Sequence, residues 1–293
     1  DADDTLSDDE PFALGALDAY ALQAEWLEEC LGGRAEAAHR ALLRARGALP
    51  QGRVGDLAWE TVADAVAPLA RALAPDLAGA RQVPVDLEVG GRRVVGTLRR
   101  VTPQGLVRYT VAAFKPKYLL DAWVEHLALL AVAPAGVVPQ TRLVTRDRTW
   151  VFGAVDCPTA RLAELVQLYT DGLREPLPFF PASSHEWVAG AADPDKARQK
   201  AIDAWQGSEF LARQGIASER ADPANRIGWG HRDDPFAPRF EALAEAVYGP
   251  LLAAGQKARS ACLFEISVGC MVWGKPLLRC DFRRSGRPAK ADC

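Results

Sequence analysis

The sequence predicts an α/β fold in which a small mixed sheet flanked by helices is followed by a helical section. Residues 85–89 and 107–111 alternate between apolar and polar side chains at the period of half-buried strands. Helical spacing occurs on both sides of that segment, and it is the only clear period between residues 161 and 254. With 293 residues, of which 49% are hydrophobic and 25% charged, the chain has the composition of a soluble globular protein with an ample core.

The N-terminal part predicts two helices after an acidic linker end at residues 1–10. Apolar residues at helical spacing mark the first helix, and Gly32-Gly33 is its stop. These apolar residues are Leu17, Tyr20, Ala24, Leu27 and Leu31. A second helix is expected from Leu57 to Leu73, and Pro68 either breaks it once or lies near its end.

Three strands and two turns are predicted next. Val85, Leu87 and Val89 alternate with acidic residues, and Gly90-Gly91 is a two-residue hairpin turn because both glycines tolerate a positive φ. The return strand covers residues 92–101 and ends at the Pro-Gln-Gly turn of residues 103–105. A third alternation extends over residues 107–111. We therefore expect three consecutive strands of the mixed sheet here.

After these strands, the sequence pattern predicts one helix, one further strand and then only helices. The first helix has Leu119, Trp123, Leu127 and Leu130 on one face, and residues 148–155 form the strand. A helix over residues 162–173 follows, another begins with Asp193 as N-cap and Pro194 at its first position, and the last extends over residues 240–251. We expect residues 11–160 to form the core, residues 161–254 to complete the same domain, and residues 255–293 to be an atypical tail.

Charge is segregated along the chain, although the formal net charge is only −3. Residues 1–33 hold ten acidic side chains and no Lys or Arg, whereas residues 89–120 hold seven basic side chains and no acid. The basic set consists of Arg92, Arg93, Arg99, Arg100, Arg108, Lys115 and Lys117. These residues are candidate DNA-binding residues through phosphate contacts. The alternative is a solvated face that protects an edge strand from aggregation.

Several classes of site lack support in the sequence. The six cysteines include no C-x-x-C pair, so no structural zinc site is expected. No G-x-x-x-x-G-K-[ST] motif occurs, so we expect no ATP-binding loop. Without a secretory signal or an apolar run of about 18 residues, we expect reduced thiols, a cytoplasmic protein and no membrane partner. Met271 is the only Met, so we expect the C-terminal part of a longer protein.

The predicted order of helix, three strands, helix and strand resembles the core of the PD-(D/E)xK nuclease fold. In that fold a carboxylate on one central strand and an acid–x–Lys on the next hold a divalent cation. The matching positions here are Gly96-Thr97-Leu98-Arg99 and Ala113-Phe114-Lys115. Arg99 and Ala113 replace both carboxylates and only Lys115 is kept, so we expect no catalytic residue and no metal at this site.

Five segments resemble one family more directly: DDEPFALGALDAYAL, LDAWVEHLALLA, LVQLYTDGLREPLPFFP, DPDKARQKAIDAWQG and FEALAEAVYGPLL. Together, over about residues 9–254, they resemble the C-terminal region of RecC, the gamma subunit of exodeoxyribonuclease V, the RecBCD helicase–nuclease. The resemblance implies a noncatalytic DNA-engaging and assembly domain that acts in double-strand-break repair by homologous recombination. It also implies DNA and RecB-like and RecD-like subunits as partners, with ATP and Mg²⁺ in those subunits and no cofactor in this chain.

The segment LREPLPFFP contains the candidate interface residues Phe179 and Phe180. Its prolines favour a stiff, extended loop that displays both aromatic rings to a partner subunit or to bases. The alternative is that the rings fold back onto the chain's own core. Residues 216–235 are expected to form a long polar loop, and Trp123 and His126 to be helix-packing residues rather than ligands.

Two rival functions remain open. The first is an active metal-dependent nuclease of the same fold that recruits carboxylates from Asp86, Glu88 or Asp121. The second is a structural scaffold without nucleic-acid contacts. Metal-dependent cleavage distinguishes the first rival, and salt-sensitive DNA binding distinguishes the second.

Overall fold

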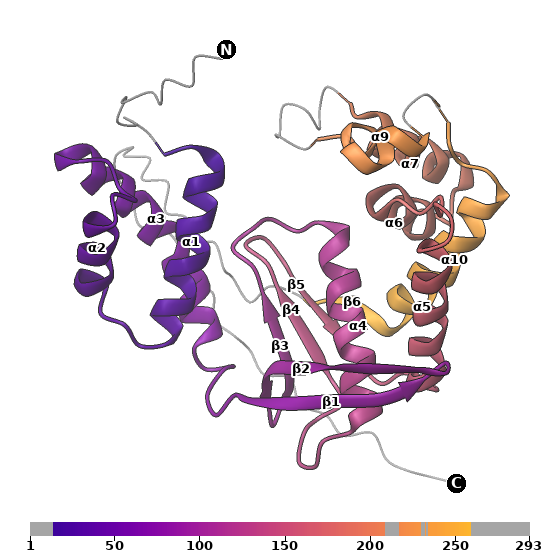
Figure 1. The fold of residues 1–293 in the computed structure, drawn as a ribbon, viewed down its shortest axis with the longest axis horizontal. Helices are drawn as coiled ribbons and strands as arrows, with labels where there is room; N and C mark the ends of the chain where they lie inside the picture. The colour runs from indigo at the N-terminus through magenta and orange to yellow at the C-terminus, as the bar shows by residue number, and fades with distance from the viewer. Residues whose placement is uncertain (1–13, 209–216, 230–231, 233, 259–293) are drawn as a thin grey trace, which may run out of the picture. The chain divides into compact units, whose positions relative to one another are not determined.

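The centre of the computed structural model, which describes residues 14–208, 217–229, 232 and 234–258, is a six-stranded mixed sheet (Figure 1). Its strands are β1 (Arg81–Val89), β2 (Arg92–Thr102), β3 (Gly105–Tyr109), β4 (Thr141–Val144), β5 (Thr149–Phe152) and β6 (Gly255–Lys257), paired in sequence order. Only β3 and β4 are parallel, and α4 (Pro116–Val132) connects them. The α/β class with a mixed sheet and flanking helices is confirmed.

The β1–β2 hairpin turns at Gly90-Gly91, as predicted, and both glycines have positive φ. The register shifts between the pairs Arg81–Val101 and Val83–Leu98, and Arg100 on the longer side has a φ of 60°. This arrangement is a β-bulge, which bends β2 at the two consecutive arginines. The bulge was not predicted, because sequence alternation alone does not reveal an inserted residue.

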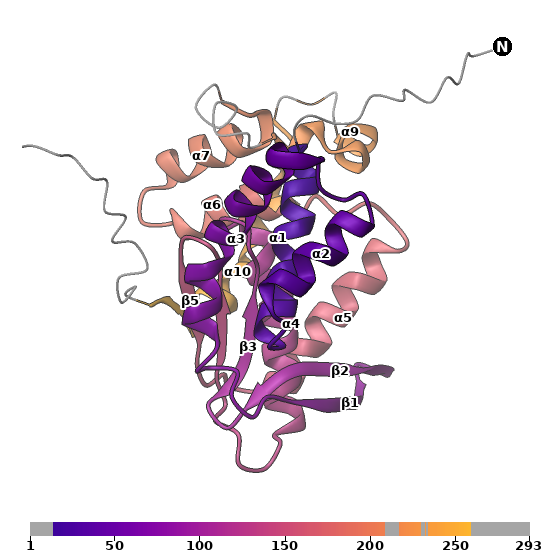
Figure 2. The same ribbon diagram turned by 90° about the vertical axis from the view of Figure 1, so that its left-hand side faces the viewer.

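One face of the sheet is covered by α1 (Ala16–Leu31), α2 (Glu36–Ala45) and α3 (Gly52–Leu73), which Figure 2 shows from their side. Trp26, Trp59 and Leu73 of these helices form one core with Val107 and Val144 of the sheet. The first predicted helix and its end at Gly32 are confirmed. The second extends through Pro68 and begins earlier than predicted, while α2 was missed.

The other face packs against α4, α5 (Pro158–Gly172) and α10 (Pro238–Ala254). Trp123, Phe152 and Tyr248 are among its buried residues. His126 of α4 is also buried, and its Nδ1 and Nε2 lie 2.9 Å from Thr141 Oγ1 and 2.8 Å from the Gly153 carbonyl oxygen. Burial lowers the pKa of His126 to about 4, so this side chain is neutral and has the packing role predicted for it.

The helical section continues with α6 (Pro181–Ala189), α7 (Pro194–Gln206), the 3₁₀ turn η1 (Glu219–Ala221) and α9 (Pro223–Trp229). Asp193 caps α7 as predicted, accepting a hydrogen bond from the Lys196 N–H. The Glu219 carboxylate accepts hydrogen bonds from the Ala182 and Ser183 N–H groups and so caps α6. The described part of residues 216–235 is therefore partly helical rather than a long loop.

The acidic linker end and the atypical tail are predicted at the two ends of the chain. Residues 1–10 and 259–293 lie outside the described residues, while residues 255–257, predicted to begin the tail, form strand β6 on β5. In the described part of the chain, none of the helices is both long enough and apolar enough to cross a bilayer.

Candidate nucleic-acid interface

The seven basic residues predicted to bind DNA lie at four separate places, three on the sheet and one at the start of α4. Arg92 and Arg93 are at the tip of the β1–β2 hairpin, where Gly90 lies against Ala163 of α5. Roughly 23 Å further along β2, at about 3.3 Å per residue, the bulge carries Arg99 and Arg100. Arg108 lies on the adjacent strand, and Lys115 and Lys117 begin α4. The basic run of the sequence is therefore not one surface.

At the hairpin tip, Arg93 is paired with a carboxylate. Its Nε and one terminal nitrogen lie 2.8 Å and 2.7 Å from the two oxygens of Asp86. This bidentate hydrogen bond lowers the pKa of Asp86. Arg92 and Glu88 beside them are exposed.

At the bulge, Arg100 is paired with Glu28 of α1. The two side chains are 2.6 Å apart, and the Arg100 guanidinium lies 4.3 Å from the centre of the Tyr109 ring. Burial raises the pKa of Tyr109 to about 12, so its hydroxyl stays protonated. Glu28 belongs to the acidic segment 1–33, and the fold thus uses one of its acids to neutralise the basic segment.

On the opposite face of the sheet, Arg108 of β3 forms an ion pair with Glu125 of α4. Burial raises the pKa of Glu125, and the Arg108 charge opposes that rise. Both partners are about one-third exposed. Arg100 of β2 and Arg108 of β3 are therefore each held by a carboxylate from a helix.

The structure corrects the prediction that the acid–x–Lys position lies on a strand, because β3 ends before it. Arg99 lies on β2 as expected, but β3 ends at Tyr109, so Ala113, Phe114 and Lys115 lie in the loop that leads to α4. The chain leaves the sheet after the Thr110 N–H donates to the Val144 carbonyl. Alternation through Val111 extended the predicted strand too far, because Val111 is buried against α1–α3 from a loop.

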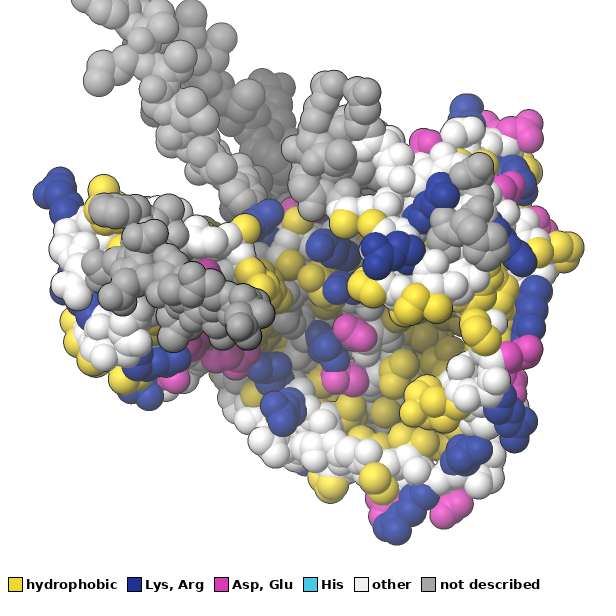
Figure 3. Space-filling model, turned by 45° about the horizontal axis from the view of Figure 1, so that its top comes forward, with side chains coloured by type: hydrophobic (Ala, Val, Ile, Leu, Met, Phe, Trp, Pro, Cys, Tyr) yellow, Lys and Arg dark blue, Asp and Glu magenta, His cyan; other side chains and the backbone are white. Residues whose placement is uncertain are grey.

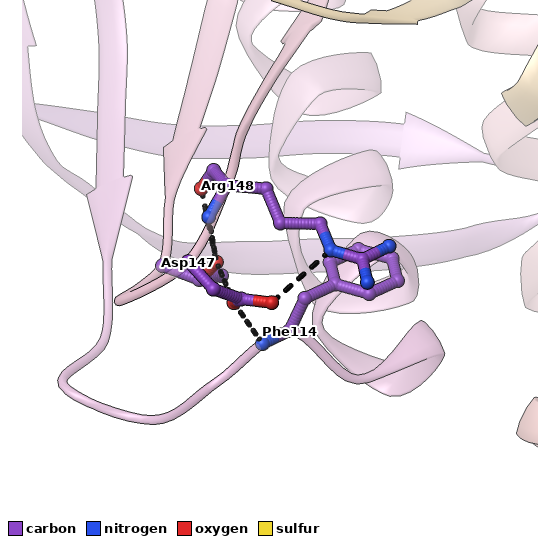
Figure 4. A network of polar contacts seen from close by, with 4 residues as sticks. Phe114, Asp147 and Arg148 are labelled. Atoms are coloured by element: carbon purple, nitrogen blue, oxygen red, sulfur yellow. Dashed lines mark hydrogen bonds and ion pairs between the residues drawn. The ribbon is translucent and has the colours of Figure 1, made fainter. Parts of the chain in front are cut away.

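A turn between β4 and β5 holds this loop in place (Figure 4). Asp147 Oδ1 accepts hydrogen bonds from the Phe114 N–H at 2.6 Å and from Thr145 Oγ1 at 3.0 Å. Arg148 Nε donates to Asp147 Oδ2 at 3.2 Å, and the Arg148 guanidinium lies 4.5 Å from the centre of the Phe114 ring. Burial alone would raise the pKa of Asp147, but these hydrogen bonds lower it.

The same turn brings two arginines beside the start of α4. The Arg146 N–H donates to the Ala112 carbonyl at 2.9 Å, so Arg146 and Arg148 flank the loop that ends at Lys115. Arg146 and Lys115 are exposed, and neither forms an ion pair with another described residue. Sequence reasoning missed both arginines, since they lie outside the basic run and Asp147 stands between them.

The two candidate interface aromatics have different environments. Phe180 is fully buried among Trp205, Phe236 and Phe240, with its ring centre 4.4 Å from that of Trp205, which corrects its prediction as an interface anchor. Phe179 is half-buried and lines an apolar groove of about 390 Å³. Figure 3 shows hydrophobic side chains lining a hollow on this face of the molecule. The groove residues are Leu120, Trp123, Val124, Leu165, Leu168, Tyr169, Leu177, Phe179, Leu243 and Val247.

The described residues hold no group of three His, Cys, Asp or Glu side chains placed to bind a metal ion. Asp86 and Glu88 share the exposed face of β1, whereas Asp121 is on α4. The rival set of carboxylates is therefore divided between two elements, and Asp86 already binds Arg93.

Comparison with known proteins identifies relatives of this chain. Residues 1–192 match the RecC C-terminal domain family. The RecBCD enzyme subunit RecC of Escherichia coli K12 is 28% identical over 229 residues, which is 73% of this chain and 20% of the relative. The subunits of the same name from Mycolicibacterium smegmatis and Mycobacterium tuberculosis CDC 1551 are each 30% identical, over 280 and 276 residues. These alignments cover 87% and 86% of this chain, which spans a quarter or less of the relatives' length.

Proposed function

The chain belongs to the RecC C-terminal domain family, and from this premise we propose that it is a noncatalytic domain that engages DNA and supports subunit assembly in a RecBCD-type complex. The relatives' name, RecBCD enzyme subunit RecC, supports a role in DNA repair and recombination. RecB-like and RecD-like subunits are the proposed partners. They would supply ATP-driven unwinding and Mg²⁺-dependent cleavage, and this chain would need no cofactor.

The Arg100–Glu28 pair is the observation that carries the noncatalytic part of the proposal. Hydrolysis of a phosphodiester by a divalent cation needs carboxylate oxygens that face an open site. Where β2 adjoins β3 the charged side chains are Arg99, Arg100 and Arg108, and their guanidinium groups repel a cation. Glu28 and Glu125 lie close to them, but each already binds an arginine.

Cleavage and metal-binding assays test this part. With Mg²⁺ or Mn²⁺, we expect the chain to cleave neither linear duplex nor single-stranded DNA, and calorimetry to show no saturable Mn²⁺ binding. Cleavage that disappears in Asp86→Asn/Glu88→Gln would contradict the proposal and establish the rival nuclease. The same double variant, purified in the same way, is the control for a contaminating nuclease, because a contaminant would cleave in both preparations.

DNA binding tests the other part. The exposed cations make us expect weak binding to forked and single-stranded DNA at about 50 mM salt, with an affinity that falls steeply as salt rises. Absence of binding even at that salt concentration would favour the scaffold function.

A further inference from the structure

One end of the sheet combines exposed cations with an aromatic ring. We call it the sheet-end patch and define it as Phe114, Lys115, Lys117, Arg146 and Arg148. It includes the loop after β3, the first residues of α4 and the turn between β4 and β5. Hydrogen bonds from the Phe114 and Arg146 N–H groups join these segments.

We propose that the sheet-end patch binds single-stranded DNA, with phosphates on Lys115, Lys117 and Arg146 and a base stacked on Arg148. This inference rests on the proposed DNA engagement and deepens it, because it names the form of DNA and the residues. It also assigns binding to a place other than the arginines of β2 and β3.

The charge balance of the patch favours an anion. Its four cations outnumber the carboxylates that act on them: Asp147, whose two oxygens already bind Arg148, Thr145 and the Phe114 N–H, and Glu186 of α6, whose pKa is lowered by His185 and in smaller part by Arg148. Lys115, Lys117 and Arg146 are exposed, so they keep their positive field toward solvent. Phosphates spaced along a strand meet such a cluster without displacing an internal ion pair.

The stacked side chains favour unpaired bases. The Phe114 ring lies below the Arg148 guanidinium and nearly parallel to Trp150, at an interplanar angle of 18°. The Arg148 side chain is 41% exposed, so part of it reaches solvent while its guanidinium lies over Phe114. A base stacks on a guanidinium plane only where it is free of its own neighbours, as in a single strand.

The patch is also preorganised. Asp147 fixes the backbone at Phe114, and the Arg146 N–H fixes Ala112, so the cations are not carried by a freely moving loop. Less conformational entropy is then lost on binding. An acidic polypeptide would use the same charges but not the stacked plane, and this difference makes the two partners distinguishable.

Fluorescence anisotropy of the full chain with labelled (dT)₂₀ and with a 20-bp duplex tests the proposal. At about 50 mM salt, Lys115→Gln/Arg146→Gln should weaken (dT)₂₀ binding by roughly 50-fold, as expected for two lost phosphate contacts. Phe114→Leu and Arg148→Lys should each weaken (dT)₂₀ by at least about fivefold and leave duplex binding unchanged. Arg148→Lys keeps the charge, and so it tests the stack even if Phe114→Leu disturbs the fold. The matched control is Arg92→Gln/Arg93→Gln at the hairpin tip.

Three outcomes would overturn the inference. If the hairpin-tip variant loses as much affinity as the patch variant, DNA engagement stands but its place is wrong. If poly-L-glutamate competes with (dT)₂₀ at equal charge concentration and the stacking variants bind normally, the patch is a general anion surface suited to an acidic protein. If the unsubstituted chain binds no DNA at all, the inference fails together with the proposed function.

Discussion

Two groups of cations, one on strands β2 and β3 and one in the loop and turn at the end of the sheet, differ in what holds them. Arg93, Arg100 and Arg108 on β2 and β3 are each paired with a carboxylate, whereas Lys115 and Arg146 in the sheet-end patch form no ion pair with a described residue. An exposed cation that is paired within the fold contributes little to the attraction of a distant anion. The number of basic residues in a segment is therefore a poor measure of its capacity to bind DNA.

The partners of the first group come from three different elements. Asp86 is on the neighbouring strand, while Glu28 and Glu125 come from helices on opposite faces of the sheet. The acidic N-terminal segment and the basic central segment are thus partly neutralised by each other. Nothing comparable reaches Lys115 within the described residues.

Reversing charge in the sheet-end patch should have the largest effect. We expect Lys115→Glu/Arg146→Glu to lower the affinity for single-stranded DNA by more than about 100-fold at about 50 mM salt, because two phosphate contacts become repulsive. The matched control, Arg92→Glu/Arg93→Glu, makes the same change of net charge and should cost about threefold or less. Equal losses in the two variants, measured by anisotropy, would remove the distinction between the two groups.

The next largest effect is the dependence of folding stability on pH, which should change independently of DNA binding. The pKa of His126 is about 4 in the folded chain and ordinarily 6.5. Between these pH values the unfolded chain therefore binds a proton at His126 that the folded chain does not bind. Stability should fall as the pH drops from 6.5 to 4, by at most about 3 kcal/mol.

Urea unfolding at several pH values measures this loss. His126→Asn should lower stability at pH 7 and flatten the dependence on pH, while the salt dependence of DNA binding at pH 7 stays the same. An unchanged pH dependence in the variant would show that other groups cause it.

Freeing one arginine from its carboxylate partner tests whether pairing within the fold limits its contribution to DNA binding. Glu28→Gln leaves Arg100 without its carboxylate, so we expect the free energy of unfolding to fall by about 1 kcal/mol and DNA affinity at low salt to rise a few-fold. Glu29→Gln on the same helix makes an equal change of charge but frees Arg34, which is not on the sheet. If both variants bind DNA equally well, net charge rather than the freed Arg100 explains the rise.

The smallest effect is expected at the hairpin. The Arg93–Asp86 pair is exposed, and such pairs contribute little to stability. Asp86→Asn should leave the urea midpoint unchanged within error and alter DNA affinity less than twofold. A clear loss of stability would mean that the pair organises the hairpin.

Much of the fold could be predicted from local patterns. Alternation predicted β1 and β3, the glycine pair marked the turn that leads into β2, and the Asp193-Pro194 cap marked a helix start, all of which the structure confirms. Strand β5 was predicted within residues 148–155, whereas β4, which also has four residues, was missed because Thr141-Arg142-Leu143-Val144 shows no alternation. Helix α6 was missed because its prolines indicated an extended loop, although Pro181 occupies the first helical position.

The candidate site was less accessible to sequence reasoning. The basic residues themselves are visible in the sequence, but their pairing depends on contacts such as Arg100–Glu28, which spans 72 positions. Arg146 and Arg148 joined the candidate site only because a turn between two short strands brings them beside the start of α4. Tertiary contacts likewise separate Phe179 from Phe180, although the two are adjacent in sequence. Phe179 lines the apolar groove, and Phe180 is buried in a core.

The most direct test compares how two variants with the same loss of charge respond to salt. For single-stranded DNA, each phosphate contact contributes about 0.7 to the slope of log affinity against log salt. We predict that Lys115→Gln/Arg146→Gln reduces the magnitude of that slope by about 1.4, and that Arg93→Gln/Arg100→Gln leaves it unchanged. Equal reductions in both variants, or a reduction only in the second, would contradict the claim that the fold neutralises one group of cations and leaves the other to bind DNA.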